Sequence, residues 1–162
     1  GRVTVRVRFG AGWRAIAEDE AVLARLGQMA LVQAGVGPLG QNELDSIAAG
    51  RKLGFDFSIE DGTFVFEGAT RQEDLADQLW LFAAKLSQPR WDLGPLERAR
   101  ASAQLSYDAM GADPSGVINR DLDWLLHGRD PRFATPDPAA LAAASPEAFR
   151  SLWERLPPHN PA

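Results

Sequence analysis

The chain has 162 residues, which suits a single domain with a substantial apolar core. Hydrophobic residues make up 45% of it, including five Trp and eight Phe, and this content argues against disorder. The absence of cysteine excludes disulfides, thiolate zinc sites and thiol nucleophiles. The net charge of −5 gives no electrostatic footprint for nucleic acid, and no apolar run approaches the ~20 residues of a membrane span. We therefore expect neither a nucleic-acid partner nor a membrane span.

The first third of the chain predicts a strand followed by two helices. Apolar and polar side chains alternate strictly over residues 2–9, as in a half-buried strand. The spacing becomes helical over about residues 19–34, and Gly35 should end that helix. A short helix is expected over about residues 41–49. The apolar stripe expected on the longer helix consists of Val22, Leu26, Met29 and Ala30.

A hairpin follows over residues 53–66, where alternating apolar positions flank Asp61-Gly62. A two-residue Asp-Gly turn predicts positive φ at both positions. Thr70 and Glu73 have the spacing of a capping box, which should open the next helix. The apolar stripe expected on that helix consists of Leu75, Leu79, Phe82 and Leu86.

The remainder of the chain predicts only helices. One should run from Pro95 to about Met110 and another from about residue 115 to 126. Asp137-Pro138 and Ser145-Pro146 each place a capping residue before a first-turn proline, so two short helices should follow. Strands and helices thus segregate, which predicts an α+β fold with a largely antiparallel sheet covered on one face by helices. We expect one domain over residues 1–154 and a Pro-rich tail or truncated linker over 155–162.

A series of short segments, taken in order and with their spacing, resembles one protein family. These segments are Val3–Phe9 with Gly10-Ala11-Gly12, Met29-Ala30-Leu31, Glu43-Leu44, Phe55–Phe66, Asp74-Leu75, Leu96–Arg100, Asp113-Pro114 and Leu125–Arg132. From Val3 to about Trp153, the chain resembles the insulinase, pitrilysin and mitochondrial-processing-peptidase family of zinc metallopeptidases. It is most similar to the first domain of the second, non-catalytic half of a long bacterial member. The resemblance implies a closed chamber formed with other domains or a further subunit, with peptide substrate inside it.

Active members of this family carry an inverted zinc motif, H-x-x-E-H, on the first long helix. Two imidazoles four residues apart hold the metal while the glutamate acts as general base on its water. The resemblance places the two histidine positions at Ala24 and Gln28, the glutamate at Gly27, and a distant carboxylate ligand within residues 104–106. None of these positions carries a metal ligand of the required type. We therefore expect no catalytic, metal or cofactor site in this chain, and zinc only in the catalytic half of the parent protein.

Other candidate sites are weaker. The two histidines are His127, near an expected helix end where a cation meets the helix dipole, and His159 in the Pro-rich tail. Acidic clusters at residues 18–20 and at Asp121 with Asp123 are typical of solvated faces, and the less favoured interpretation is a Ca²⁺ or Mg²⁺ site. The match of residues 35–40 to a dinucleotide fingerprint follows a helix and contains a proline, so it is a false positive.

The sequence thus predicts a non-catalytic structural and substrate-chamber domain of an insulinase-like zinc metalloendopeptidase, inactive by itself. The alternative is an inactive subunit or protein-interaction module with no role in proteolysis. A third possibility is that the strand over residues 2–9 accepts an extended peptide by strand addition. The compartment stays open between the periplasm, which the resemblance implies, and the cytoplasm.

Overall fold

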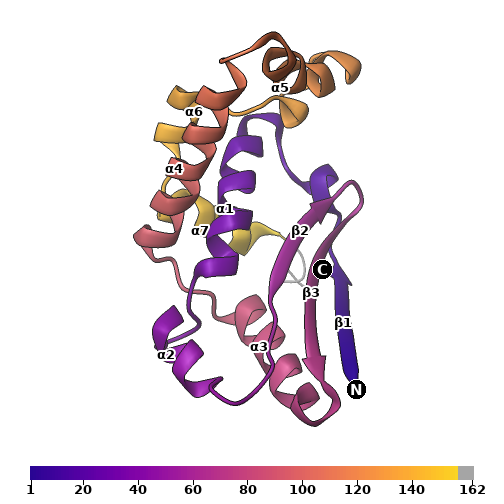
Figure 1. The fold of residues 1–162 in the computed structure, drawn as a ribbon, viewed down its shortest axis with the longest axis vertical. Helices are drawn as coiled ribbons and strands as arrows, with labels where there is room; N and C mark the ends of the chain where they lie inside the picture. The colour runs from indigo at the N-terminus through magenta and orange to yellow at the C-terminus, as the bar shows by residue number, and fades with distance from the viewer. Residues whose placement is uncertain (157–162) are drawn as a thin grey trace.

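A computed structural model describes residues 1–156 of the chain. Within them, β1 (Arg2–Phe9), β2 (Asp56–Glu60) and β3 (Thr63–Arg71) form an antiparallel sheet in the order β1-β3-β2. The helices lie on one side of this sheet (Figure 1). The predicted α+β class, with a sheet covered on one face, is therefore confirmed.

Seven α-helices and four short 3₁₀ segments make up the rest of the described chain. The α-helices are α1 (Ala21–Gln33), α2 (Gln41–Ile47), α3 (Leu75–Ser87), α4 (Leu93–Met110), α5 (Pro114–Leu126), α6 (Pro138–Ala143) and α7 (Pro146–Arg155). The 3₁₀ segments are η1 (Gly12–Ala15), η2 (Glu18–Glu20), η3 (Gln72–Asp74) and η4 (Pro131–Phe133).

The predicted caps before prolines are confirmed at the two C-terminal helices. The side chains of Asp137 and Ser145 accept hydrogen bonds from the backbone N–H groups of Ala140 and Ala148. Leu156, just after α7, is 6% exposed within the core. The rest of the predicted tail, including His159, lies outside the described residues.

The hairpin lies where the sequence predicts it, but its turn does not have the predicted geometry. Glu60 pairs with Thr63 across Asp61-Gly62, so the turn has two residues. Neither turn residue has a positive φ, so the expected turn type is wrong. The backbone N–H of Arg14 in η1 donates to the carbonyl of Asp61, and this contact with a distant segment helps to set the turn. Strand β2 also begins at residue 56 and not 53.

The predicted capping box at Thr70 is wrong. Strand β3 continues to Arg71, because β1 pairs with it as far as Arg2. The Thr70 hydroxyl is buried and donates to the carbonyl of Lys52. Helix α3 then begins through η3 without any side-chain cap.

The buried face of α3 differs from the predicted stripe. Leu79 is 48% exposed and the neighbouring Trp80 is 51% exposed, whereas the polar residues Gln78 and Lys85 are fully buried. The Gln78 side-chain amide explains its own burial, since it donates to the Gly54 carbonyl and accepts from the Gly54 N–H. These two bonds hold α3 against the segment that leads into β2.

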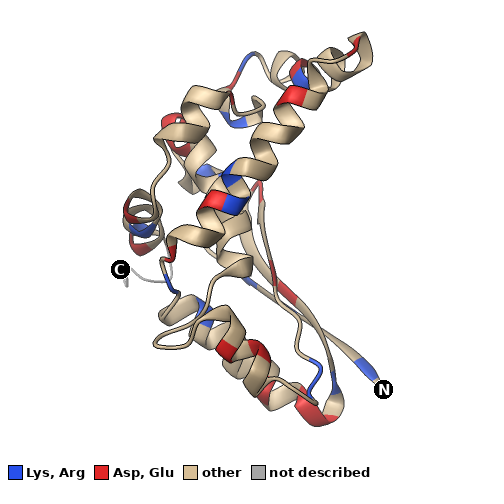
Figure 2. Cartoon of the chain, turned by 60° about the vertical axis from the view of Figure 1, so that its left-hand side comes forward, with Lys and Arg blue, Asp and Glu red and all other residues tan. Residues whose placement is uncertain are grey.

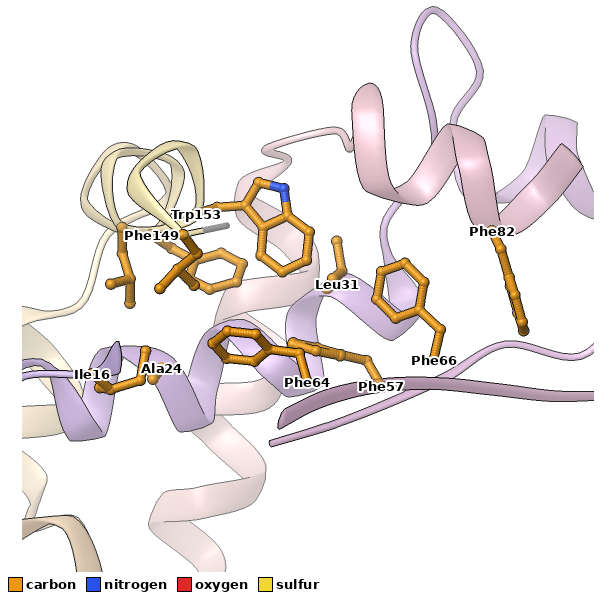
Figure 3. Close-up of a cluster of buried hydrophobic side chains, with 11 residues drawn as sticks. Ile16, Ala24, Leu31, Phe57, Phe64, Phe66, Phe82, Phe149 and Trp153 are labelled. Atoms are coloured by element: carbon orange, nitrogen blue, oxygen red, sulfur yellow. The ribbon is translucent and has the colours of Figure 1, made fainter. Parts of the chain in front are cut away.

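Aromatic side chains form the main core between the sheet and the helices. Phe57, Phe64 and Phe66 project from β2 and β3 towards Trp153 of α7, and Figure 3 shows them in one cluster. A second cluster lies between α1, α4 and α6 and consists of Leu26, Ala30, Leu96, Ala99, Leu141 and Ala144. The aromatic hairpin therefore serves packing, as its lack of interleaved basic residues predicts.

Candidate functional site

The three positions that resemble the zinc-binding positions of the family lie on α1, where two of them belong to the packed core. Ala24 is 1% exposed and lies in the main core beside Ile16 (Figure 3). Gly27 is buried against Phe149 of α7, and a Cβ built on it would lie closer than 3.0 Å to three atoms of that ring, a separation that real Cβ atoms do not reach. Gln28 is half-buried. The space that a motif glutamate would occupy is therefore filled by an aromatic ring.

One residue of the predicted α1 stripe faces solvent. Met29 is 37% exposed, while Leu26 and Ala30 are buried against α4 and α6 as predicted. The buried surface of α1 extends around the helix to Ala24, because α7 and the sheet cover that side as well. Leu23 and Leu31 broaden the apolar stripe on that side, so the sequence indicates part of this second buried face.

The position predicted for the distant ligand lies on the exposed half of α4. Leu105 is 71% exposed, and the Gln104 side chain donates to Asp108 on the same helix. The Ser106 hydroxyl donates to the carbonyl of Ser102, also within α4. Leu105 and Ser106 are therefore exposed on α4, whereas Ala24 sits in the core.

Residues 1–156 contain no group of three or more His, Cys, Asp or Glu side chains that could hold a metal ion. In the two acidic segments, Glu20 is ion-paired with Arg155 and Asp121 with Arg120. The Arg120 guanidinium holds the pKa of the Asp121 carboxyl below its usual value through a side-chain hydrogen bond.

His127 lies at the C-terminal end of α5, as predicted. Its Nδ1 is 2.7 Å from the carbonyl oxygen of Asp123, and its ring stacks on Phe133 at a centroid separation of 3.7 Å. These contacts close the end of the helix onto η4. Within residues 1–156, no helix is long and apolar enough to cross a membrane.

The most unusual group in the structure is Lys85, which the sequence analysis did not single out. Lys85 is 2% exposed, and its ammonium donates to the carbonyls of Leu31 at 2.8 Å and Ala34 at 2.5 Å, at the end of α1. It also lies 4.6 Å from the centroid of the Phe55 ring. Burial lowers the pKa of Lys85 to about 8, while the negative charge of Asp45 acts in the opposite direction. A cation thus closes the negative pole of α1 from inside the protein.

A cavity of about 390 Å³ lies above Lys85, between α2 and α3. Its walls are largely apolar, and its polar lining comprises a glutamine, two aspartates and an arginine besides Lys85. Volume and lining are both within the usual range of ligand sites. The lining residues are Val32, Gln41, Leu44, Asp45, Ile47, Ala48, Arg51, Leu53, Phe55, Asp77, Trp80, Leu81 and Lys85.

Helix α5 carries an apolar face that nothing in residues 1–156 covers. Ile118, Leu122, Leu125 and Leu126 follow helical spacing and are between 44% and 71% exposed, and no residue of α5 is buried. The helix lies at one extremity of the molecule (Figure 1). Exposed apolar faces of this kind are typical of surfaces at which proteins bind other molecules or domains.

Comparison with known proteins shows the fold and no closer relationship. No family model and no curated protein match the sequence. A peptidase M16 inactive domain from Pseudomonas fluorescens matches with a TM-score of 0.73 at 16% identity, over 96% of this chain and 38% of that one. The ferredoxin protease FusC, solved as a mutant in complex with Arabidopsis ferredoxin, matches with a TM-score of 0.74 at 18% identity, over 95% of this chain and 17% of that one.

The first half of the periplasmic protease PqqL from Escherichia coli also matches, with a TM-score of 0.69 at 14% identity, over 95% of this chain and 35% of that one. The chain therefore has the fold of an M16 peptidase domain, which confirms the resemblance at the level of fold. It spans between 17% and 38% of the length of these three structures. Because both an inactive domain and a first half share this fold, catalytic capacity must be judged from the residues of α1.

Proposed function

We propose that this chain is a non-catalytic structural domain of a larger M16-type zinc metallopeptidase, where it forms part of the chamber that encloses peptide substrates. The observation that carries the proposal is the contact between Gly27 and Phe149. A domain kept for zinc chemistry needs a carboxylate and two imidazoles on this helix and an open coordination position for water. At the corresponding positions this chain has a glycine under an aromatic ring, a buried methyl group and an amide.

The α5 face supports the assembly part of the proposal. Leucine and isoleucine side chains exposed along four helical positions favour contact with another folded surface over contact with water. The structures that share this fold are longer chains, so neighbouring domains of the same peptidase are the expected partners. Such a domain would help to hold the chamber closed and to keep water and folded proteins from the zinc site elsewhere in the assembly.

Zinc titration by calorimetry at neutral pH tests the non-catalytic part. We expect no stoichiometric tight binding and no peptidase activity from the chain alone. A control variant with His127→Ala and His159→Ala removes both imidazoles, so weak binding that disappears in this variant is a surface-histidine effect. Tight binding of one zinc ion that survives in the control variant would contradict the proposal.

An inactive subunit without a role in proteolysis remains the alternative. The two functions differ in what accompanies the domain: a peptidase assembly requires an H-x-x-E-H half in the same reading frame or an adjacent one. Co-expression with that half and measurement of peptide hydrolysis, with and without this domain, distinguishes them. Unchanged hydrolysis in the absence of the domain would favour the alternative.

A further inference from the structure

The cavity between α2 and α3 has a thin outer wall. Helix α2 has seven residues, of which only Leu44 is buried. Figure 1 shows α2 beside α3 at the end of the molecule away from α5. The apolar lining continues onto the surface through Ile47 and Trp80, each 51% exposed. The cavity is therefore the inner part of a larger apolar surface, which is open to an extended partner.

One polar atom in the wall of this cavity has no partner among residues 1–156. The Gln41 side chain donates from Nε2 to Oδ1 of Asp45 at 2.8 Å, which fixes the orientation of the amide. Its Oε1 atom is buried and accepts no hydrogen bond. A buried carbonyl oxygen without a donor costs free energy, and an incoming N–H group would relieve that cost. Because Oε1 itself is buried, a donor from a ligand would reach it only after a shift of α2.

Asp45 is the one acidic side chain in the lining of the cavity that forms no salt bridge within residues 1–156. The Arg51 guanidinium forms a salt bridge with Asp77 at 3.0 Å and donates a hydrogen bond to the carbonyl of Ile47. The Lys85 ammonium is fully buried and donates hydrogen bonds to the backbone carbonyls at the end of α1. Asp45 is exposed and receives a hydrogen bond only from the neutral Gln41 amide among the described side chains. The neighbouring Glu43 is also exposed, and Figure 2 shows acidic positions gathered on the helices at this end of the molecule.

We propose that this cavity binds a peptide segment that carries a bulky apolar side chain next to a basic residue. The apolar side chain enters between Leu44 and Leu81, and the basic side chain pairs with Asp45 beside the Trp80 ring. A peptide fits better than a small amine, because the apolar surface extends beyond the cavity along Ile47 and Trp80. This inference goes beyond the scaffold role, and it does not depend on zinc or on peptidase activity.

Titration of the full chain with a synthetic peptide tests the inference. The probe is an acetylated, amidated Gly-Lys-Phe-Lys-Gly, followed by ¹H–¹⁵N NMR with the Trp80 indole N–H as reporter. We expect saturable shifts confined to residues 41–53 and 77–85. A Glu-Phe-Glu peptide and a Lys-Ala-Lys peptide should each bind at least fivefold more weakly. Equal binding of the Glu-Phe-Glu peptide, shifts elsewhere, or no shifts at millimolar peptide would overturn the proposal.

Substitutions assign the binding to this cavity. Asp45→Asn should weaken the probe at least fivefold, whereas Asp108→Asn, an exposed acidic residue on α4, should leave it unchanged. Ala48→Phe should fill the cavity and abolish binding, with Ala142→Phe on the exposed face of α6 as the matched control. Because Asp45 lies on the surface, its variant keeps the test valid even where Ala48→Phe unfolds. Phenethylamine that bound as tightly as the peptide would contradict the assignment to a peptide.

Discussion

Replacement of Gly27 by alanine should destabilise the protein, although alanine is the better helix former. In the interior of a helix, Gly→Ala normally gains about 1 kcal/mol. At Gly27 the new methyl group would lie closer than 3.0 Å to three ring atoms of Phe149. Carbon atoms in contact normally lie about 3.5–4.0 Å apart, so the ring must move by about 1.5–2 Å.

The ring has little room to move. Phe149 is 5% exposed and meets Trp91 edge-on at a centroid separation of 5.5 Å, with Trp153 at 6.3 Å. Overpacking of a well-packed core costs about 1–3 kcal/mol. The cost therefore exceeds the helix-propensity gain, and we expect a net loss of about 1 kcal/mol in the free energy of unfolding.

Urea denaturation followed by tryptophan fluorescence measures this loss. Gly94→Ala is the matched control, because a Cβ at Gly94 of α4 would contact only an Arg98 side-chain nitrogen at 3.4 Å. That variant should be stabilised by about 0.5–1 kcal/mol. In a Phe149→Leu background, Gly27→Ala should no longer destabilise, which a double-mutant cycle would show. If Gly27→Ala stabilises as much as the control, the packing argument for α1 is wrong.

Three further predictions concern groups that the fold buries or caps. The lowered pKa of Lys85, about 8 against 10.5 in the unfolded chain, means that the unfolded state binds more protons between these values. Urea unfolding should therefore show stability rising by up to about 3 kcal/mol from pH 8 to pH 10.5 relative to Lys85→Met, and a fall would refute the assigned direction. Gln78→Leu leaves both backbone groups of Gly54 without a partner and should cost about 2–4 kcal/mol, whereas an unchanged urea midpoint would show that water replaces the amide. Ser145→Ala removes the cap of α7 and should lower the free energy of unfolding by about 1 kcal/mol. Asp113→Ala removes the cap of α5, which has no buried residue, and should lower it by less. The reverse order would contradict the assignment of α7 to the core.

The sequence predicted most elements of the fold because their signals are local. Strict alternation over residues 2–9 and the proline-preceded caps depend only on neighbouring residues, and both are confirmed. The Asp61-Gly62 turn and the Thr70 cap were predicted wrongly for the opposite reason. Each is decided by a distant segment: η1 donates to the turn, and β1 extends β3 through Thr70. Tertiary pairing overrides a local motif wherever the two compete.

The candidate cavity could not be found from the sequence. A lysine in a helix is expected to be exposed, and Lys85 differs only because the end of α1 supplies carbonyl oxygens to its ammonium. With Lys85 buried, the face of α3 that packs against the protein differs from the predicted stripe. It exposes Leu79 and places Trp80 on the rim of the cavity. The apolar stripe of α3 therefore predicts the wrong buried face. Gln78 and Lys85 are buried in its place because backbone groups far away in the sequence supply their hydrogen bonds.

The sequence predicts no zinc site because the required residue types are missing, but it does not show how those positions are packed. Phe149 follows Gly27 by more than a hundred residues, and only the docking of α7 brings its ring onto α1. The two positions are coupled, since a glutamate at Gly27 would require the ring to leave and the ring requires a residue without a side chain. Restoring H-x-x-E-H on α1 alone would therefore place ionisable side chains into an aromatic core without creating an open coordination position. The packing of α1 against α7 therefore supports the proposed structural role over a dormant catalytic one.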